Sequence, residues 1–208
     1  YMVELLRSST QDAGVWLNPK LMGLSPEVDA LLPYWLGAWA MQIAPAWIAP
    51  DFAARLPFGL MLALTLVATW YGVYHLARSP GALPVAFAFG GEARPADYAR
   101  ALADGGLLAL IGCLGLAQLS HETTPALAQL CFTSLIFYAV AAMRFRSALP
   151  LVSAGAGLVG LTLSGGAAIA LLFGAGSALL CGLERPASDE RPAHRTLWTA
   201  GLWLVTGL

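Results

Sequence analysis

The chain of 208 residues is 58% hydrophobic, and charged side chains make up only 11% of it. Soluble domains carry roughly 25% charged residues, so this composition predicts an integral membrane protein surrounded by membrane lipids rather than a soluble one. The formal net charge of −1 offers no basic stripe for a phosphate backbone and argues against nucleic acid as a partner.

Residues 1–30 mix charged and apolar positions, and Gly and Pro break them into turns. The apolar stretch Leu31–Ile48 is interrupted by proline and rich in Trp and Tyr, which favour the headgroup level of a bilayer. Trp35 and Trp39 are four residues apart and share one helical face, which favours a helix lying in the interface over one that spans it. We therefore predict that residues 1–54 form an extramembrane loop with an interfacial helix.

Residues 55–208 contain six apolar segments, and each is a candidate transmembrane helix. The first follows Arg55 and ends before Arg78, and at about 1.5 Å per residue it covers the roughly 30 Å of the hydrocarbon layer. Between it and the next crossing, residues 79–105 are charged and only briefly apolar, which predicts a surface-lying or re-entrant segment. The six predicted crossings are 56–77, 106–120, 125–143, 148–163, 167–183 and 196–208.

Local signals mark two of the connections between these crossings. Thr124 is a suitable N-cap, followed by Pro125 at the first helical position, where the missing N–H costs nothing. Ser164-Gly165-Gly166 predicts the turn between the fourth and fifth crossings. The chain starts at Tyr1 and stops within an apolar run, so we expect it to be part of a longer polypeptide.

The basic residues fall unevenly on the two sides of this predicted membrane, and the excess of Arg and Lys marks the cytoplasmic side. The predicted fold is thus an all-α membrane bundle, with residues 1–54 facing the periplasm or exterior. The outside carries Arg7, Lys20 and Arg55, and the cytoplasmic side carries Arg78, Arg94, Arg100, Arg144, Arg146, Arg185, Arg191 and Arg195.

Small residues recur every four positions on the fourth and fifth crossings, a spacing that lets helix backbones approach closely in lipid. We predict that both stripes are packing faces, against each other or against another membrane subunit. The stripes are Ala156, Gly160 and Ser164, and Ala170, Gly174, Ala178 and Gly182.

Residues that could carry chemistry are few, and we expect no cofactor and no metal. The three His are scattered over both predicted sides, and no phosphate-binding loop, zinc motif or nucleophile elbow is present. His121-Glu122 is suggestive as a metal or headgroup ligand pair, although a four-residue turn needs polar residues equally. The acids of the outer loop offer candidates for a general base, or simply a solvated surface: Glu4, Asp12, Glu27, Asp29 and Asp51.

Three runs in the outer loop resemble a bacterial family of multi-spanning glycosyltransferases, related to aminoarabinose transferase and protein mannosyltransferase. The runs are Trp16–Gly23, Leu32–Leu36 (LPYWL) and Phe52–Pro57 (FAARLP). The resemblance implies a polyprenyl-phosphate sugar as donor and a lipid or protein acceptor at the outer face. Their residue types and predicted position at the outer surface make Trp35, Trp39, Arg55, His121 and Glu122 the candidates to contact such a lipid headgroup.

The chain departs from the family pattern at residues that matter for catalysis. No Asp-Glu pair precedes the resembling segment, and an apolar residue near Ala30-Leu31 replaces the Lys of the family's Lys-Pro-Pro element. A Lys that pairs with phosphate makes a charge-assisted contact that a neutral residue does not supply. Two interpretations remain open, and the first is favoured: a non-catalytic accessory subunit of a larger membrane complex, or an active glycosyltransferase.

Overall fold

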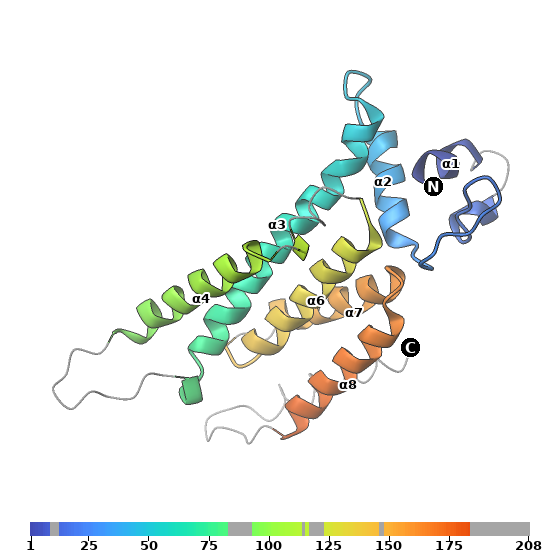
Figure 1. Ribbon diagram of the computed structural model, residues 1–208. Helices are drawn as coiled ribbons and strands as arrows, with labels where there is room; N and C mark the ends of the chain where they lie inside the picture. The colour runs from blue at the N-terminus through green and yellow to red at the C-terminus, as the bar shows by residue number, and fades with distance from the viewer. Residues whose placement is uncertain (9–12, 83–92, 114, 117–122, 146–147, 184–208) are drawn as a thin grey trace.

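The computed structural model describes residues 1–8, 13–82, 93–113, 115–116, 123–145 and 148–183. Over these residues the chain is all-helical, as the sequence predicts, and the only strand-like pairing described is an isolated bridge between Leu21 and Leu24 (Figure 1). The elements are α1 (Met2–Ser8), η1 (Ala13–Trp16), α2 (Leu32–Ile43), α3 (Pro50–Ala77), η2 (Pro80–Ala82), α4 (Pro95–Ile111), α6 (Pro125–Ala142), α7 (Ala148–Leu163) and α8 (Ala167–Leu183).

The helix α3 is the longest described helix, and α2, α4 and α6 pack on it (Figure 1). Its start, Pro50, lies before the predicted Leu56, because Pro50 suits the first helical position and Asp51 interacts favourably with the helix dipole. The 28 residues of α3 extend about 42 Å, longer than the hydrocarbon layer of a bilayer. Seven of its nine buried positions follow one another in steps of four and three and so form one continuous face: Ala54, Phe58, Met61, Thr65, Ala68, Gly72 and His75.

The helix α6 is the centre of the bundle, between α3 and α7 (Figure 1). Glycines allow close contact on both of its sides: Phe137 of α6 lies against Gly72 of α3, and Ile136 lies against Gly157 of α7. Thr124 and Pro125 take the N-cap and first helical positions as predicted, although the Thr124 side chain makes no capping hydrogen bond.

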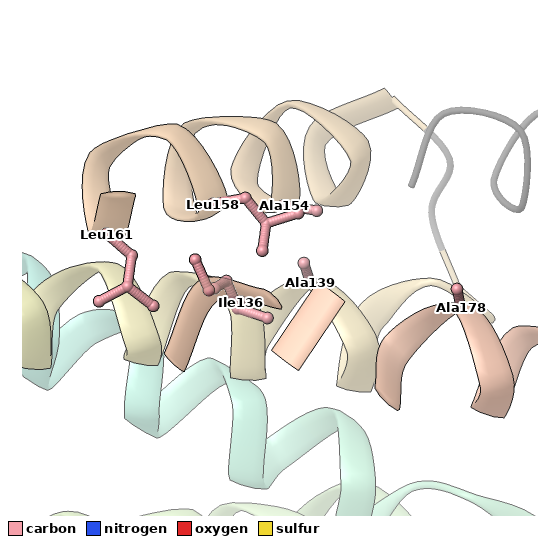
Figure 2. Close-up of a cluster of buried hydrophobic side chains, with 7 residues drawn as sticks. Ile136, Ala139, Ala154, Leu158, Leu161 and Ala178 are labelled. Atoms are coloured by element: carbon pink, nitrogen blue, oxygen red, sulfur yellow. The ribbon is translucent and has the colours of Figure 1, made fainter. Parts of the chain in front are cut away.

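Side-chain contacts decide which small residues of α7 and α8 lie inside. Ala154 and Leu158 of α7 point toward Ile136 and Ala139 of α6, with Ala178 of α8 beside them (Figure 2). Gly160, Ser164, Ala170 and Gly174 are also buried, and Gly182 lies in the last turn of α8, beyond the residues whose packing is described.

One member of the predicted stripes lies elsewhere: Ala156 is on the exposed side of α7. The reason is that α7 packs chiefly on α6, and the ring of Phe132 lies over Gly160 while Ile136 lies over Gly157. The small-residue face of α7 therefore passes through Gly157 and Gly160.

The helix α4 differs from the predicted crossing 106–120, because it begins at Pro95, within the segment expected to lie at the surface. Its Ala99 and Ala103 are fully buried against α3, and Trp70 of α3 donates a hydrogen bond of 2.8 Å from its indole N–H to Asp104. Packing of an Ala-rich face thus extends this helix through charged sequence. Residues 114 and 117–120 of that crossing, and all of the crossing 196–208, lie outside the described residues.

The turn between α7 and α8 holds the N-terminal segment in place. Gly165 adopts φ +81°, and Gly166 donates a backbone hydrogen bond of 2.9 Å to the carbonyl of Leu161, as in a glycine-terminated helix end. Leu31 donates a backbone hydrogen bond of 2.8 Å to the carbonyl of Leu163. Residues 28–31 are therefore seated on this turn.

Two described helices, α3 and α6, are long and apolar enough to cross a membrane, whereas α7 and α8 are apolar but shorter. The bounds of α7 and α8 coincide with those predicted for two crossings. Among the described helices, membrane-spanning length is thus established for two rather than for the six predicted.

Candidate functional site

One concavity among the described residues lies at the end of the bundle where α3 begins, which we call the Arg55 end. It is an open pocket of about 330 Å³. Segments far apart in the sequence meet here, because α2 packs antiparallel on the start of α3 while α1 packs on α2 (Figure 1). The lining consists of Tyr1, Met2, Val3, Tyr34, Met41, Asp51, Ala54, Arg55 and Thr123, and we call it the Arg55 pocket.

Arg55 and Asp51 are the charged residues of the pocket, one helical turn apart on α3. Both side chains are exposed. Within the part of the chain that the structure describes, neither is joined in a salt bridge; the described bridge links Arg100 to Asp97, on α4, at 2.9 Å. The guanidinium of Arg55 thus keeps its hydrogen-bond donors available for an anion in the pocket.

Two tyrosines give the pocket an aromatic wall. The rings of Tyr1 and Tyr34 are 5.2 Å apart between centroids and tilted by 42°, and Tyr34 is buried with Leu5 and Ala30. Burial raises the pKa of the Tyr34 phenol above its ordinary value, and neighbouring Tyr1 raises it further. Tyr34 is therefore a neutral hydroxyl at physiological pH, able to donate a hydrogen bond.

The tryptophans predicted to contact headgroups form a cluster beside the pocket rather than in its lining. Trp35 donates a hydrogen bond of 2.7 Å to the carbonyl of Trp16. The Trp39 ring lies 6.0 Å from that of Trp35 and 6.4 Å from that of Trp16. Trp35 thus joins α2 to the N-terminal segment, whereas Trp39 is exposed.

The predicted pair His121 and Glu122 lies outside the described residues. The next residue, Thr123, lines the Arg55 pocket, so the start of α6 reaches this site. Of the candidate general bases, Asp51 is in the lining, whereas Asp12 lies outside the described residues. No group of three or more His, Cys, Asp or Glu side chains that could hold a metal is found in the described ranges.

Sequence reasoning singled out Arg55 but not the tyrosines or Thr123 that share its pocket. Tyr1, Tyr34 and Thr123 belong to three different segments, and no spacing rule relates them. A partial signal was present in LPYWL, where Tyr34 stands beside Trp35, but that pattern does not show which way each ring faces.

At the opposite end of α3, which we call the Arg78 end, side chains of α3 pack against Phe145 from the segment after α6. The guanidinium of Arg78 lies over the rings of Tyr74 and Phe145, at 5.5 Å and 5.4 Å from their centroids. His75 is buried, with its ring 5.2 Å from that of Phe145. The arginine at this end therefore contributes to packing rather than facing an open pocket.

No family model, curated protein or solved structure matches this chain. The resemblance of the outer loop to glycosyltransferases thus remains a prediction from the sequence.

Proposed function

We propose that this chain is a multi-pass helical protein of the bacterial inner membrane whose Arg55 pocket binds the phosphate headgroup of a lipid-linked substrate. In this proposal it is an accessory, non-catalytic subunit of a larger membrane complex, built on a glycosyltransferase-like scaffold. The polyprenyl-phosphate sugar suggested by the outer-loop resemblance is the proposed ligand class.

One observation carries the proposal: an exposed arginine, without an ion pair to any described residue, lines a pocket at the start of a long apolar helix. An arginine binds phosphate through several N–H donors in a fixed planar arrangement. A neutral Tyr34 hydroxyl and Thr123 add uncharged donors to the same wall.

The distribution of charge supports placing this pocket on the outer face. The Arg78 end bears Arg78, Arg94 and Arg144, which are exposed, and an excess of Arg is typical of the cytoplasmic side. With α3 and α6 crossing the membrane in the same direction, α7 returning and α8 crossing again, the Arg55 pocket then opens outward. The six crossings of the sequence prediction belong to this proposal.

The surroundings of Ala30 support an accessory role over catalysis. This residue stands near the position where the resembling enzymes have the Lys of their Lys-Pro-Pro element, and here it is 1% exposed. It packs with Leu5 and Tyr34 instead of reaching the pocket. A cationic partner for a sugar phosphate is thus replaced by an apolar contact.

A second function, active sugar transfer, is favoured by the position of Asp51. Its carboxylate lines the pocket together with Arg55, where a base beside a bound acceptor hydroxyl could remove its proton. In this alternative Arg55 holds the donor phosphate and Asp51 activates the acceptor.

Binding of a short-chain polyprenyl phosphate to the purified protein in lipid nanodiscs tests the first proposal. Hydrogen bonds to charged groups contribute about 1.5–3 kcal/mol, so Arg55→Ala should weaken binding roughly tenfold to a hundredfold. Arg55→Lys should retain part of the affinity because it keeps the charge. Arg94→Ala, at the opposite end of the bundle, is the matched control, and equal binding by Arg55→Ala and the native chain would refute the proposal.

Two measurements distinguish the two functions: sugar transfer by the chain, and the subunits that purify with it from native membranes. If sugar transfer from a labelled donor occurs and Asp51→Asn abolishes it while phosphate binding persists, the chain is an enzyme. If no transfer occurs and the chain purifies from native membranes with other subunits at constant stoichiometry, it is an accessory subunit.

A further inference from the structure

We infer that the short hairpin at Leu21–Leu24 inserts its apolar tip into the bilayer leaflet on the Arg55 side, as a second membrane anchor apart from the helices. The inference rests on the membrane placement proposed above, but not on the ligand of the Arg55 pocket.

The hairpin and the residues that lead into it display large apolar side chains that nothing in the described structure covers. Met22 is 93% exposed, Leu24 72% and Leu17 71%. Three such residues within eight positions of one loop form an unusual surface for a segment in water, because each exposed apolar side chain forgoes the free energy of burial.

The backbone holds this tip in a defined shape. Leu21 and Leu24 exchange two backbone hydrogen bonds of 2.9 Å each, and the two residues between them have positive φ, 51° at Met22 and 84° at Gly23. Such two-residue turns ordinarily use Asn, Asp or Gly at the first position. A bulky Met in this backbone conformation is unfavourable, so its presence at the most exposed point suggests a role for the side chain itself.

Contacts with the helices set the depth of the hairpin. In the membrane placement proposed above, α7 is a crossing, so the turn after it lies at the bilayer surface on the Arg55 side. The 16 residues of α7 extend only about 24 Å, which keeps this turn close to the hydrocarbon layer. Leu31 is hydrogen-bonded to Leu163 just before this turn, and Val28 packs on Gly165 within it. Leu24 is four residues from Val28, at most about 14 Å of extended chain, so the tip lies within reach of the interface.

The charge beside the tip suits a lipid surface. Lys20 is exposed and directly precedes Leu21, where its ammonium group can reach the phosphate level while its aliphatic part follows the apolar residues. The base of the loop is held by Trp16, which packs with Leu5 and Ala30. The occupant of this surface is therefore lipid. The apolar tip with Met22 and Leu24 contacts the acyl chains, and the Lys20 ammonium group lies at the headgroups.

Spin labels report the depth of single residues in the full chain reconstituted in nanodiscs of phosphatidylethanolamine and phosphatidylglycerol. With the native cysteines replaced, a nitroxide is attached to Met22→Cys, to Ser25→Cys as the control on the same loop, and to Val67→Cys on the exposed face of α3. We expect the ratio of collisions with oxygen to collisions with a water-soluble nickel complex to be roughly tenfold higher at position 22 than at position 25. The added variant Leu24→Asp should lower the ratio at position 22 and leave position 67 unchanged.

The outcomes test the insertion of the hairpin tip and the membrane placement of the helices separately. A lipid environment at position 67 with an aqueous one at position 22 overturns the hairpin inference alone. An aqueous environment at position 67 overturns the membrane placement and the inference with it. Because the nanodisc contains no partner protein besides the scaffold belt around its rim, a tip that is covered only by a protein partner would read as aqueous and would also overturn the inference.

Discussion

The two ends of α3 carry one arginine each and use it in opposite ways. The guanidinium of Arg78 lies over the rings of Tyr74 and Phe145, and the buried His75 contacts the same two rings. Arg55 lines an open pocket and forms no ion pair with a described residue. The difference shows that an arginine at the end of a long apolar helix can be packed against aromatic rings or left exposed at an open pocket.

The reason lies in what packs against each end. At the Arg78 end the chain after α6 returns over α3 and brings Phe145 onto the guanidinium. At the Arg55 end the neighbours are α1 and α2, whose contribution is a wall of Tyr1 and Tyr34 at the side of the pocket rather than a ring over the cation.

The largest expected effect comes from the core that both ends share. A methyl group added by Gly157→Ala would lie 2.6 Å from Ile136 and 2.9 Å from the backbone oxygen of Phe132. Because a helix backbone cannot move as a side chain can, the two helices would have to shift apart to remove the clash. We expect a loss of about 2 kcal/mol of unfolding free energy, measured by thermal unfolding in detergent.

The matched control for this prediction is Gly155→Ala on the same helix, where nothing lies within 4 Å of the added carbon. There Ala should be neutral or stabilising by about 0.5–1 kcal/mol through helix propensity. Equal stability of the two variants would contradict the close packing of α7 on α6.

The second prediction affects the Arg55 end alone. Gly165 has φ +81°, and a methyl group there would lie 2.5 Å from Val28 and 3.1 Å from the carbonyl oxygen of Asp29. Gly165→Ala should cost about 1–2 kcal/mol from the left-handed backbone and should release residues 28–31 from the turn. Amide hydrogen exchange at Leu31 should accelerate while the Arg78 end is unchanged.

A third prediction compares the removal of each of the two arginines. Arg78→Ala should lower the free energy of unfolding by about 0.5–1 kcal/mol per ring contact, and Arg55→Ala should change it by less than about 0.5 kcal/mol. Thermal unfolding of both variants side by side provides the measurement. If Arg55→Ala proves as destabilising as Arg78→Ala, the distinction between a packed arginine and an available one is lost.

The smallest effect concerns pH and the pocket wall. Burial raises the pKa of Tyr34 in the folded protein, so this residue stabilises the fold below its unfolded pKa of about 10. That contribution should decline as pH rises from there through the folded pKa, because the unfolded state then releases the proton first. In Tyr34→Phe, unfolding measured across this alkaline range should lose that part of the pH dependence, and an unchanged profile would contradict the assignment.

Several helix ends could be predicted from the sequence because local chemistry sets them. Pro125 follows Thr124 at the start of α6, and Gly165 follows the last turn of α7, so these bounds agree closely with the prediction. Pro95 offers the same local signal at the start of α4, but the continuation of that helix through charged sequence depends on Ala99 and Ala103 finding a partner in α3.

By itself the sequence determined an all-helical chain, the bounds of its most apolar helices and Arg55 as a cation of interest, because composition, proline, glycine and hydrophobic runs act over a few residues. Only the tertiary structure decided that Gly157 rather than Ala156 faces α6, and that Tyr1, Tyr34 and Thr123 meet Arg55 in one pocket. These outcomes depend on the rotation and pairing of whole helices, which side chains such as Phe132 and Ile136 select through contacts between distant segments.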